Sequence, residues 1–192
     1  MKKLISVSSI VVIIATIIIG GCKSREKTPA GEKEVVIPCS GPNYFTTNKV
    51  FRSNSIGSSM DQVTSKKIAL TNARNDLAQS IQTTVKTVTD NYTNSTSMDK
   101  KEQLEQKFES LNREVVDQSL QGIRTICEKL VQTKDGTYKT YIAIELSADD
   151  LVKQYNSRLS ADDKLKIDYD YQKFKDTFDK EMEKMSKGPG TN

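Results

Sequence analysis

The residues with the widest chemical range in this chain of 192 residues are its three cysteines, Cys22, Cys39 and Cys127. A cysteine thiol can act as a nucleophile, bind a metal ion or pair with a second thiol. The chain contains no histidine. This absence excludes a Ser-His-Asp triad, a Cys-His pair and any metal site with a histidine ligand. The cysteines are also too far apart in sequence for a CxxC motif.

The first 21 residues have the composition of an export signal. Lys2 and Lys3 precede an apolar run at residues 10–19, which consists almost entirely of isoleucine and valine. A membrane-spanning helix needs about 20 apolar residues, whereas the core of an export signal needs about 7 to 15. We therefore expect residues 1–21 to be a signal peptide that is removed and takes no part in the fold.

The end of this run, Ile19, Gly20, Gly21 and Cys22, resembles the lipobox of bacterial lipoproteins. The glycines leave the backbone accessible to a membrane-embedded peptidase, which would cut between Gly21 and Cys22. The resemblance implies that the Cys22 thiol carries a diacylglyceryl group and that its new amino group is acylated. Two or more acyl chains, at about 0.8 kcal/mol per buried CH₂ group, hold a protein stably at a membrane. The alternative is an uncleaved membrane anchor in which Cys22 has no role.

The charge balance is nearly even. The chain has 29 basic and 25 acidic residues, and loss of Lys2 and Lys3 with the signal would leave 27 basic residues. Nucleic-acid-binding domains usually combine a pI above about 9 with clustered lysine and arginine. We therefore expect a membrane partner through the lipid and an envelope protein as a second partner, with no nucleic acid; the oligomeric state stays open.

Cys39 and Cys127 remain once Cys22 is acylated. Export would place both thiols in an oxidising compartment, where they can pair. A bridge would close a long loop, for which the chain-entropy model gives a stabilisation of about 4 to 5 kcal/mol. The residues leave two alternatives open, a Cys39–Cys127 disulfide or two separate buried thiols.

Two pairs of adjacent carboxylates, Asp149 with Asp150 and Asp162 with Asp163, are the other groups that could do acid–base work or bind a cation. Neighbouring residues on a helix point about 100° apart, so neither pair converges by itself. Each pair follows a serine, and acidic residues after a serine N-cap stabilise the positive end of a helix. We interpret both pairs as helix starts and expect no catalytic residue, no metal and no cofactor.

The mature chain divides into three parts. Residues 22–34 are polar and charged, with Pro29 and Gly31, which is typical of a flexible tether. Residues 35–187 carry the patterned apolar positions of one α+β domain. Glycine and proline then end the last helix, and residues 188–192 are expected to be a disordered tail.

Within the domain, apolar residues at steps of three and four predict a long amphipathic helix at residues 60–91. A second helix is expected to start at Ser97 and to continue through Val115. A strand is predicted at residues 49–57, ending in a turn at Gly57 and the serine after it.

A hairpin is the clearest strand prediction. Residues 138–146 alternate between apolar and polar types, and residues 123–132 are their expected partner. Asp135 and Gly136 between the two runs are a strong turn signal.

Ser147 and Ser160 are then predicted to start two final helices. The last helix carries an apolar and aromatic stripe from Tyr171 to Met185. This stripe has two interpretations, packing against the domain or a partly exposed surface for another chain.

Residues 66–78 resemble the alanine-rich helix, with its Ala-Arg-x-x-Leu-Ala core, of the LPP-twenty family of bacterial outer-membrane lipoproteins. Residues 115–123 look like the second signature of this family, and the family's hairpin follows. The similarity covers residues 49–159. It implies an α+β domain in β-α-α-β-β-α order, with long helices packed on one face of a small antiparallel sheet. The helical insert at residues 98–119 and the additional C-terminal helix depart from the family pattern.

The resemblance implies an outer-membrane location and a scaffolding function, because related domains occur in a flagellar assembly protein. It transfers one residue role, that of Cys22. The expected function is therefore a non-catalytic structural or interaction module in the cell envelope. The alternative is a binding protein for a small ligand or host component, which would use a pocket lined by the tyrosines at positions 138, 141, 155 and 171. An enzyme would require carboxylates that converge in a cleft.

Overall fold

The computed structural model divides the chain into two compact units, Met1–Val35 and Val36–Asn192. The expected signal, Cys22 and the tail at residues 188–192 lie outside the described residues. The description below concerns the second unit. No helix in the described part of the chain is long and apolar enough to cross a membrane. The structure describes residues 31–33, 35–95, 101–161 and 169–187, without the side chains of Lys101, Gln103 and Leu104.

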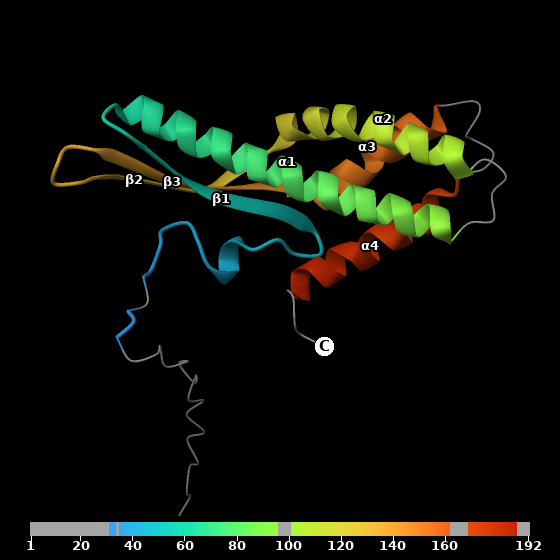
Figure 1. Cartoon of the computed structure of the whole chain (residues 1–192), viewed down its shortest axis with the longest axis horizontal. Coiled ribbons are helices and arrows are strands. Elements are labelled where there is room, and N and C mark those ends of the chain that lie inside the picture. Colours follow the sequence, from blue (N-terminus) through green and yellow to red (C-terminus); the bar gives the residue numbers. More distant parts are fainter. Residues whose placement is uncertain (1–30, 34, 96–100, 162–168, 188–192) are drawn as a thin grey trace, which may run out of the picture. The chain divides into compact units, whose positions relative to one another are not determined.

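The second unit contains a three-stranded antiparallel sheet (Figure 1). Its strands are β1 (Val50–Ser59), β2 (Arg124–Gln132) and β3 (Tyr138–Ser147), in the order β1-β3-β2. Strands β2 and β3 form the predicted hairpin, and Gly136 in its turn has a φ of 87°, which favours glycine. The middle strand β3 therefore pairs with β2, its neighbour in sequence, and with β1, which lies far earlier in the chain.

Four α-helices in the described residues pack on one face of this sheet and on one another, which confirms the α+β class. They are α1 (Gln62–Asn94), α2 (Lys101–Ser119), α3 (Ala148–Ser160) and α4 (Tyr171–Lys187). Helix α1 lies along β1 and β3 and also contacts α2 and α4. Short 3-10 turns at Pro42–Tyr44 and Leu120–Gly122 precede β1 and β2. The element order is the expected one, with α4 as the additional helix.

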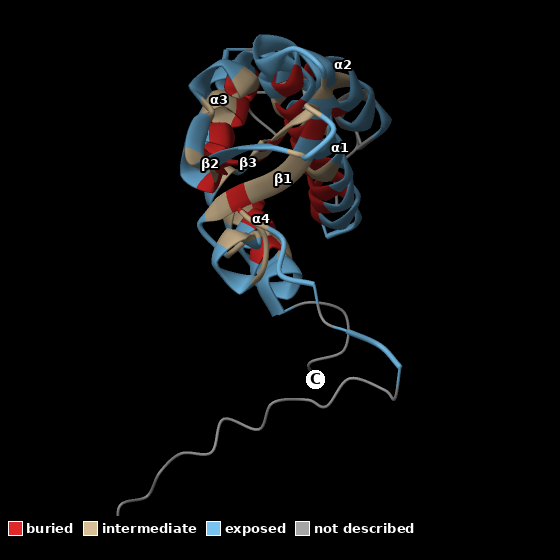
Figure 2. Ribbon diagram, turned by 90° about the vertical axis from the view of Figure 1, so that its left-hand side faces the viewer, coloured by how far each residue is buried: buried red, intermediate tan, exposed pale blue. Residues whose placement is uncertain are grey.

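Helix α1 begins at Asp61, whose side chain accepts a hydrogen bond from the Thr64 N–H at 2.7 Å. Its apolar face then packs on the sheet and on the neighbouring helices. Figure 2 shows buried residues gathered where the helices face the sheet and one another. The buried apolar residues of α1 recur at steps of three and four: Ala69, Ala73, Leu77, Ile81, Val85, Val88 and Tyr92.

Gly57 does not form the turn that the sequence predicts, because β1 continues through it to Ser59. A Cβ atom at this position would lie 2.0 Å from the Ser65 carbonyl oxygen and 2.5 Å from the Ala69 nitrogen. The missing side chain lets α1 approach the strand closely. Next to this contact, the hydroxyls of Ser65 and Thr140 form a buried hydrogen bond of 2.7 Å. Gly57 is therefore required by packing between strand and helix.

Aromatic rings fill the space between α1, α2, α3 and α4. Phe174 stacks on Phe108 with ring centroids 5.2 Å apart, and Tyr92 meets Phe174 edge to face at 5.7 Å. Phe178 contacts Phe51 at the start of β1 at 6.2 Å. The stripe of α4 therefore packs against the domain, which is the first of its two interpretations.

Of the two serines that were predicted to start helices, one does so in the structure and the other does not. Ser147 caps α3 and accepts a hydrogen bond from the Asp150 N–H at 3.2 Å, as expected. Ser160 is instead the last residue of α3, and it does not cap the final helix. Asp170 performs that role, since its side chain accepts from the Lys173 N–H at 3.0 Å. The expected start at Ser97 lies outside the described residues.

A Gly57→Ala substitution tests the close contact between β1 and α1. The added methyl group would overlap backbone atoms that cannot rotate away, so we expect the free energy of unfolding to fall by about 3 kcal/mol. Gly122→Ala is the matched control, because its Cβ would meet nothing closer than the Leu146 side chain at 3.9 Å. Urea denaturation followed by circular dichroism measures both. Equal stability of the two variants would contradict the packing role of Gly57.

Candidate functional site

The residues between the tether and β1, here called the N-terminal segment (residues 36–49), lie on the sheet face opposite α1. Alternation along β3 defines the two faces. Thr140 points to α1, where it bonds Ser65. Ala143 and Glu145 have the opposite parity and therefore face the N-terminal segment. Both are buried, so this face of β3 is covered as well.

A disulfide between Cys39 and Cys127 attaches the segment to β2. Their Cα atoms are 5.5 Å apart, and the bond closes a loop across 88 residues. Cys127 pairs with Ala143 in the sheet, and the Cys39 sulfur lies 3.6 Å from the carbonyl oxygen of Tyr141. Of the two alternatives that the sequence leaves open, the structure has the bridge. The start of the folded body is thus covalently fixed to the sheet.

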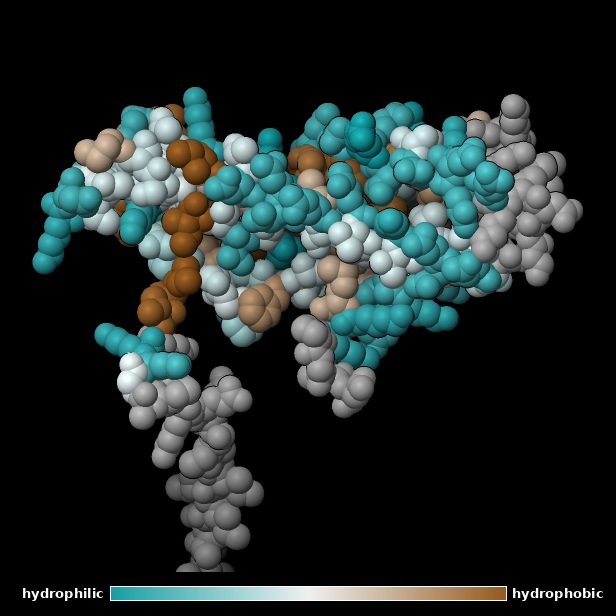
Figure 3. Space-filling model, in the orientation of Figure 1, coloured by the Kyte–Doolittle hydropathy of each residue, from teal (hydrophilic) through white to brown (hydrophobic). Residues whose placement is uncertain are grey.

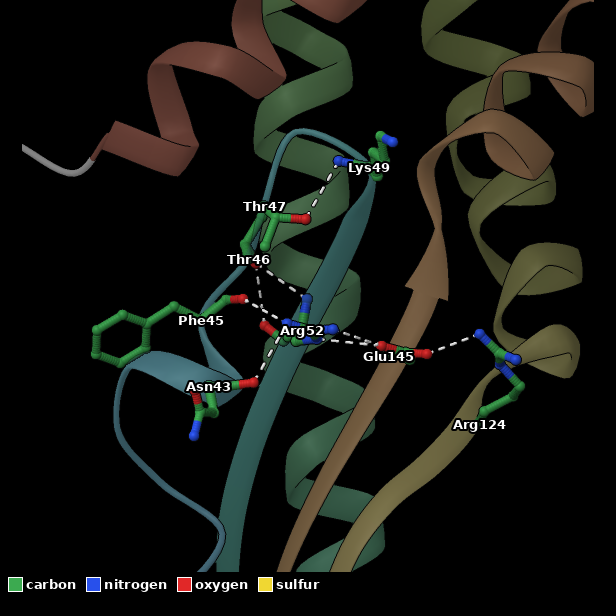
Figure 4. Close-up of polar contacts among 8 residues, drawn as sticks. All are labelled: Asn43, Phe45, Thr46, Thr47, Lys49, Arg52, Arg124 and Glu145. Atoms are coloured by element: carbon green, nitrogen blue, oxygen red, sulfur yellow. Dashed lines mark hydrogen bonds and ion pairs between the residues drawn. The ribbon is translucent and has the colours of Figure 1, made fainter.

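Glu145 is the centre of an ion network on the same face. The sheet register places it directly opposite Arg52 on β1 and Arg124 on β2. Arg52 Nη2 lies 3.0 Å from one carboxylate oxygen, and Arg124 Nη2 lies 2.7 Å from the other (Figure 4). Glu145 is only 8% exposed. Burying a carboxylate with so little contact with water costs free energy that such partners offset.

Arg52 also holds the N-terminal segment against β1. Its Nη1 donates to the carbonyl oxygens of Asn43 at 3.2 Å and Phe45 at 3.4 Å. The Thr46 hydroxyl accepts from the Arg52 N–H at 3.0 Å and donates to the Arg52 carbonyl at 3.2 Å. The Phe45 ring points away from this network (Figure 4). One arginine therefore links two strands and the segment that precedes them.

Sequence reasoning missed this network. Arg52, Arg124 and Glu145 each stand inside a predicted strand, and their opposite charges were the available signal. Their meeting depends on the pairing of strands far apart in the chain. Local patterns do not specify that pairing.

Asp149 and Asp150, the predicted acidic pair that lies within the described residues, do not converge on a site. Asp149 and Asp150 are exposed at the start of α3, where Asp150 lies 3.7 Å from Lys153 and Asp149 lies 3.8 Å from Lys175. The pair at positions 162 and 163 lies outside the described residues. Across residues 31–187, where the structure describes them, no group of three or more acidic or cysteine side chains could hold a metal ion.

Of the four tyrosines that the sequence suggested for a pocket, Tyr155 belongs to the buried core. Tyr155 is fully buried, its hydroxyl donates to Asn112 Oδ1 at 2.7 Å, and burial raises the pKa of this hydroxyl well above its usual value. A groove of about 550 Å³ lies elsewhere, between α1 and α2. Its lining is mostly polar, and its charged residues are mainly acidic, with Asp90, Glu105 and Glu109 among them.

Protein-family models, curated proteins and solved structures gave no match to this chain. The likeness of residues 66–78 and 115–123 to the LPP-twenty family therefore stays a prediction. What the structure itself establishes is the α+β class and the attachment of the N-terminal segment to the sheet.

Arg52→Ala and Arg124→Ala test which arginine matters for the network. The Arg52 side chain is 22% exposed and that of Arg124 is 74% exposed. Removing Arg52 leaves a nearly buried carboxylate poorly paired and also releases two carbonyls of the segment. We expect Arg52→Ala to lower the free energy of unfolding by about 2 kcal/mol.

The exposed Arg124 pair should contribute less than about 1 kcal/mol. Urea denaturation of both variants supplies the comparison. A larger loss of unfolding free energy for Arg124→Ala than for Arg52→Ala would contradict the role of Arg52 in holding the N-terminal segment.

Proposed function

We propose that this protein is a lipid-anchored bacterial cell-envelope lipoprotein, located in the outer membrane, whose folded domain is a non-catalytic structural or interaction module. The observation that carries the proposal is the lipobox-like sequence at residues 19–22, which follows a basic and apolar leader. In this proposal Cys22 becomes the acylated first residue of the mature protein.

The pairing of the two other cysteines supports export. Disulfides form and persist in oxidising compartments such as the periplasm and are rare in the cytosol. Cys39 and Cys127 form such a bond between the N-terminal segment and β2. A lipoprotein crossing the inner membrane would meet the conditions under which this bond forms.

The attachment of the N-terminal segment also suits a membrane-anchored protein. The chain from Cys22 to Cys39, fully extended, would span at most about 60 Å. Beyond Cys39 the disulfide and the Arg52 contacts fix the chain to the sheet. A mechanical force on the proposed lipid anchor would therefore act on the sheet through these contacts and not on the end of β1 alone.

The alternative function is a binding protein for a small ligand or host component. The α1–α2 groove of about 550 Å³ is the observation that bears on it, because its carboxylates favour a cationic ligand. A cationic ligand that raises the melting temperature of the protein, with the effect lost in Glu105→Gln, would favour this alternative over a module that acts through other proteins.

Metabolic labelling with a fatty-acid analogue tests the proposed anchor. We expect the wild-type chain to take up label and to fractionate with membranes, and Cys22→Ala to lose the label and to enter the soluble fraction, because that thiol receives the lipid. The matched control is the double variant Cys39→Ser, Cys127→Ser, which should keep its label. Label retained in Cys22→Ala, or an unlabelled soluble wild type, would overturn the proposal.

A further inference from the structure

Strand β1 is an edge strand whose outer side is covered only at its start. The N–H and C=O of Arg52 point away from β3 and are satisfied by the Thr46 hydroxyl. Backbone groups alternate in direction along a strand, so those of Asn54, Ile56 and Ser58 point outward too. No described residue forms a hydrogen bond with these outward groups. They make a short open edge of donors and acceptors.

This open edge carries no charge. Residues 53–60 contain only serine, asparagine, isoleucine, glycine and methionine, in a chain in which 28% of the residues are charged. Free strand edges usually carry charged residues that prevent pairing with another chain. The other edge strand, β2, follows that rule with Arg124, Glu128 and Lys129. Only the β1 edge is therefore left open to a further strand among the described strands.

Exposed aliphatic side chains lie on both sides of the β1 edge. Ile56 is 43% exposed on the face of the N-terminal segment, where Ile37 is exposed as well. Ile68 is exposed on α1, and at helical spacing from it Thr64 and Thr71 are exposed and uncharged. Figure 3 shows a band of hydrophobic atoms across this side of the molecule. The edge is thus flanked by apolar surface above and below the sheet.

We propose that two copies of this chain pair through β1, antiparallel and with a two-fold axis at Ile56. In this register Ile56 faces Ile56 of the partner subunit, and Asn54 faces Ser58 of the partner subunit. The outward N–H and C=O groups then satisfy one another, and two three-stranded sheets become one sheet of six strands. The Ile68 side of α1 would meet the same side of the partner helix.

The chemistry of the β1 edge favours a second copy of this chain as its partner. A lipid surface would leave the outward N–H and C=O groups without partners, whereas an extended strand satisfies them. Two-fold antiparallel pairing places residues 53–59 against the same residues of the other copy, so no like charges meet. Such an interface is closed and uses one patch twice, as most soluble homodimers do. The pairing needs neither Cys22 nor a membrane, so its test is independent of the proposed anchor.

Cysteine crosslinking tests the register in the full chain carrying Cys22→Ala, in which the native disulfide stays in place. Facing residues of a hydrogen-bonded pair have Cα atoms about 5.5 Å apart, which a disulfide can bridge. Under mild oxidation, Ile56→Cys should form a linked dimer at least about tenfold faster than the control, because pairing raises the local thiol concentration. Leu130→Cys on β2 is the control, since Leu130 is 42% exposed and Ile56 is 43% exposed.

Substituting a charged residue at the β1 edge provides a second test of the same proposal. Ile56→Lys should shift the protein from dimer to monomer in analytical ultracentrifugation, and Leu130→Lys should leave the dimer intact. Circular dichroism checks that both variants stay folded. Equal crosslinking rates for the two cysteine variants, or a Cys22→Ala chain with unaltered β1 that is monomeric at all concentrations, would overturn the proposal. A link from Ile56→Cys to a different protein would do the same.

Discussion

The bond between Cys39 and Cys127 is the constraint on which the rest of the structure depends. It fixes the N-terminal segment to the sheet face that the helices leave open. Strand β3 is then covered on both sides, by α1 and by this segment, and this coverage explains why Ala143 and Glu145 can be buried on the face away from the helices. Without the bond, the covering segment would depend on the contacts of Arg52 and on two backbone hydrogen bonds near β1, from the Thr47 N–H to the Val50 carbonyl and from the Ala148 N–H to the Lys49 carbonyl. Covalent attachment therefore compensates for the small area of a three-stranded sheet.

Much of the fold could be predicted from the sequence, because its signals are local. The long helix α1 follows from apolar residues at steps of three and four, and the hairpin follows from Asp135 and Gly136 between two alternating runs. Two features could not be predicted. Gly57 is a residue type that is typical of turns, but here it lies within β1 and allows α1 to approach the strand closely. The meeting of Arg52 with Glu145 depends on register between strands that lie far apart in the chain.

One stretch of the chain connects the proposed anchor to the outer edge of the sheet. Residues 36–60 contain the disulfide-bonded Cys39, the Arg52 contacts and the uncharged half of β1, and Lys49 and Arg52 are their only charged residues. Arg52 is ion-paired with Glu145. In a protein with the proposed lipid anchor, a surface of low charge suits contact with other protein at a membrane more than capture of a soluble ion. The attachment and the open edge therefore belong to the same functional hypothesis.

The mass of the intact mature protein, isolated from membranes without reduction, is the most direct measurement of this account. The account predicts a chain that begins at Cys22, carries the mass of its acyl chains, and does not react with iodoacetamide at Cys39 or Cys127. A polypeptide that retains residues 1–21, or that lacks acyl groups, would contradict the anchor. Two alkylated thiols at Cys39 and Cys127 would contradict the attachment of the N-terminal segment.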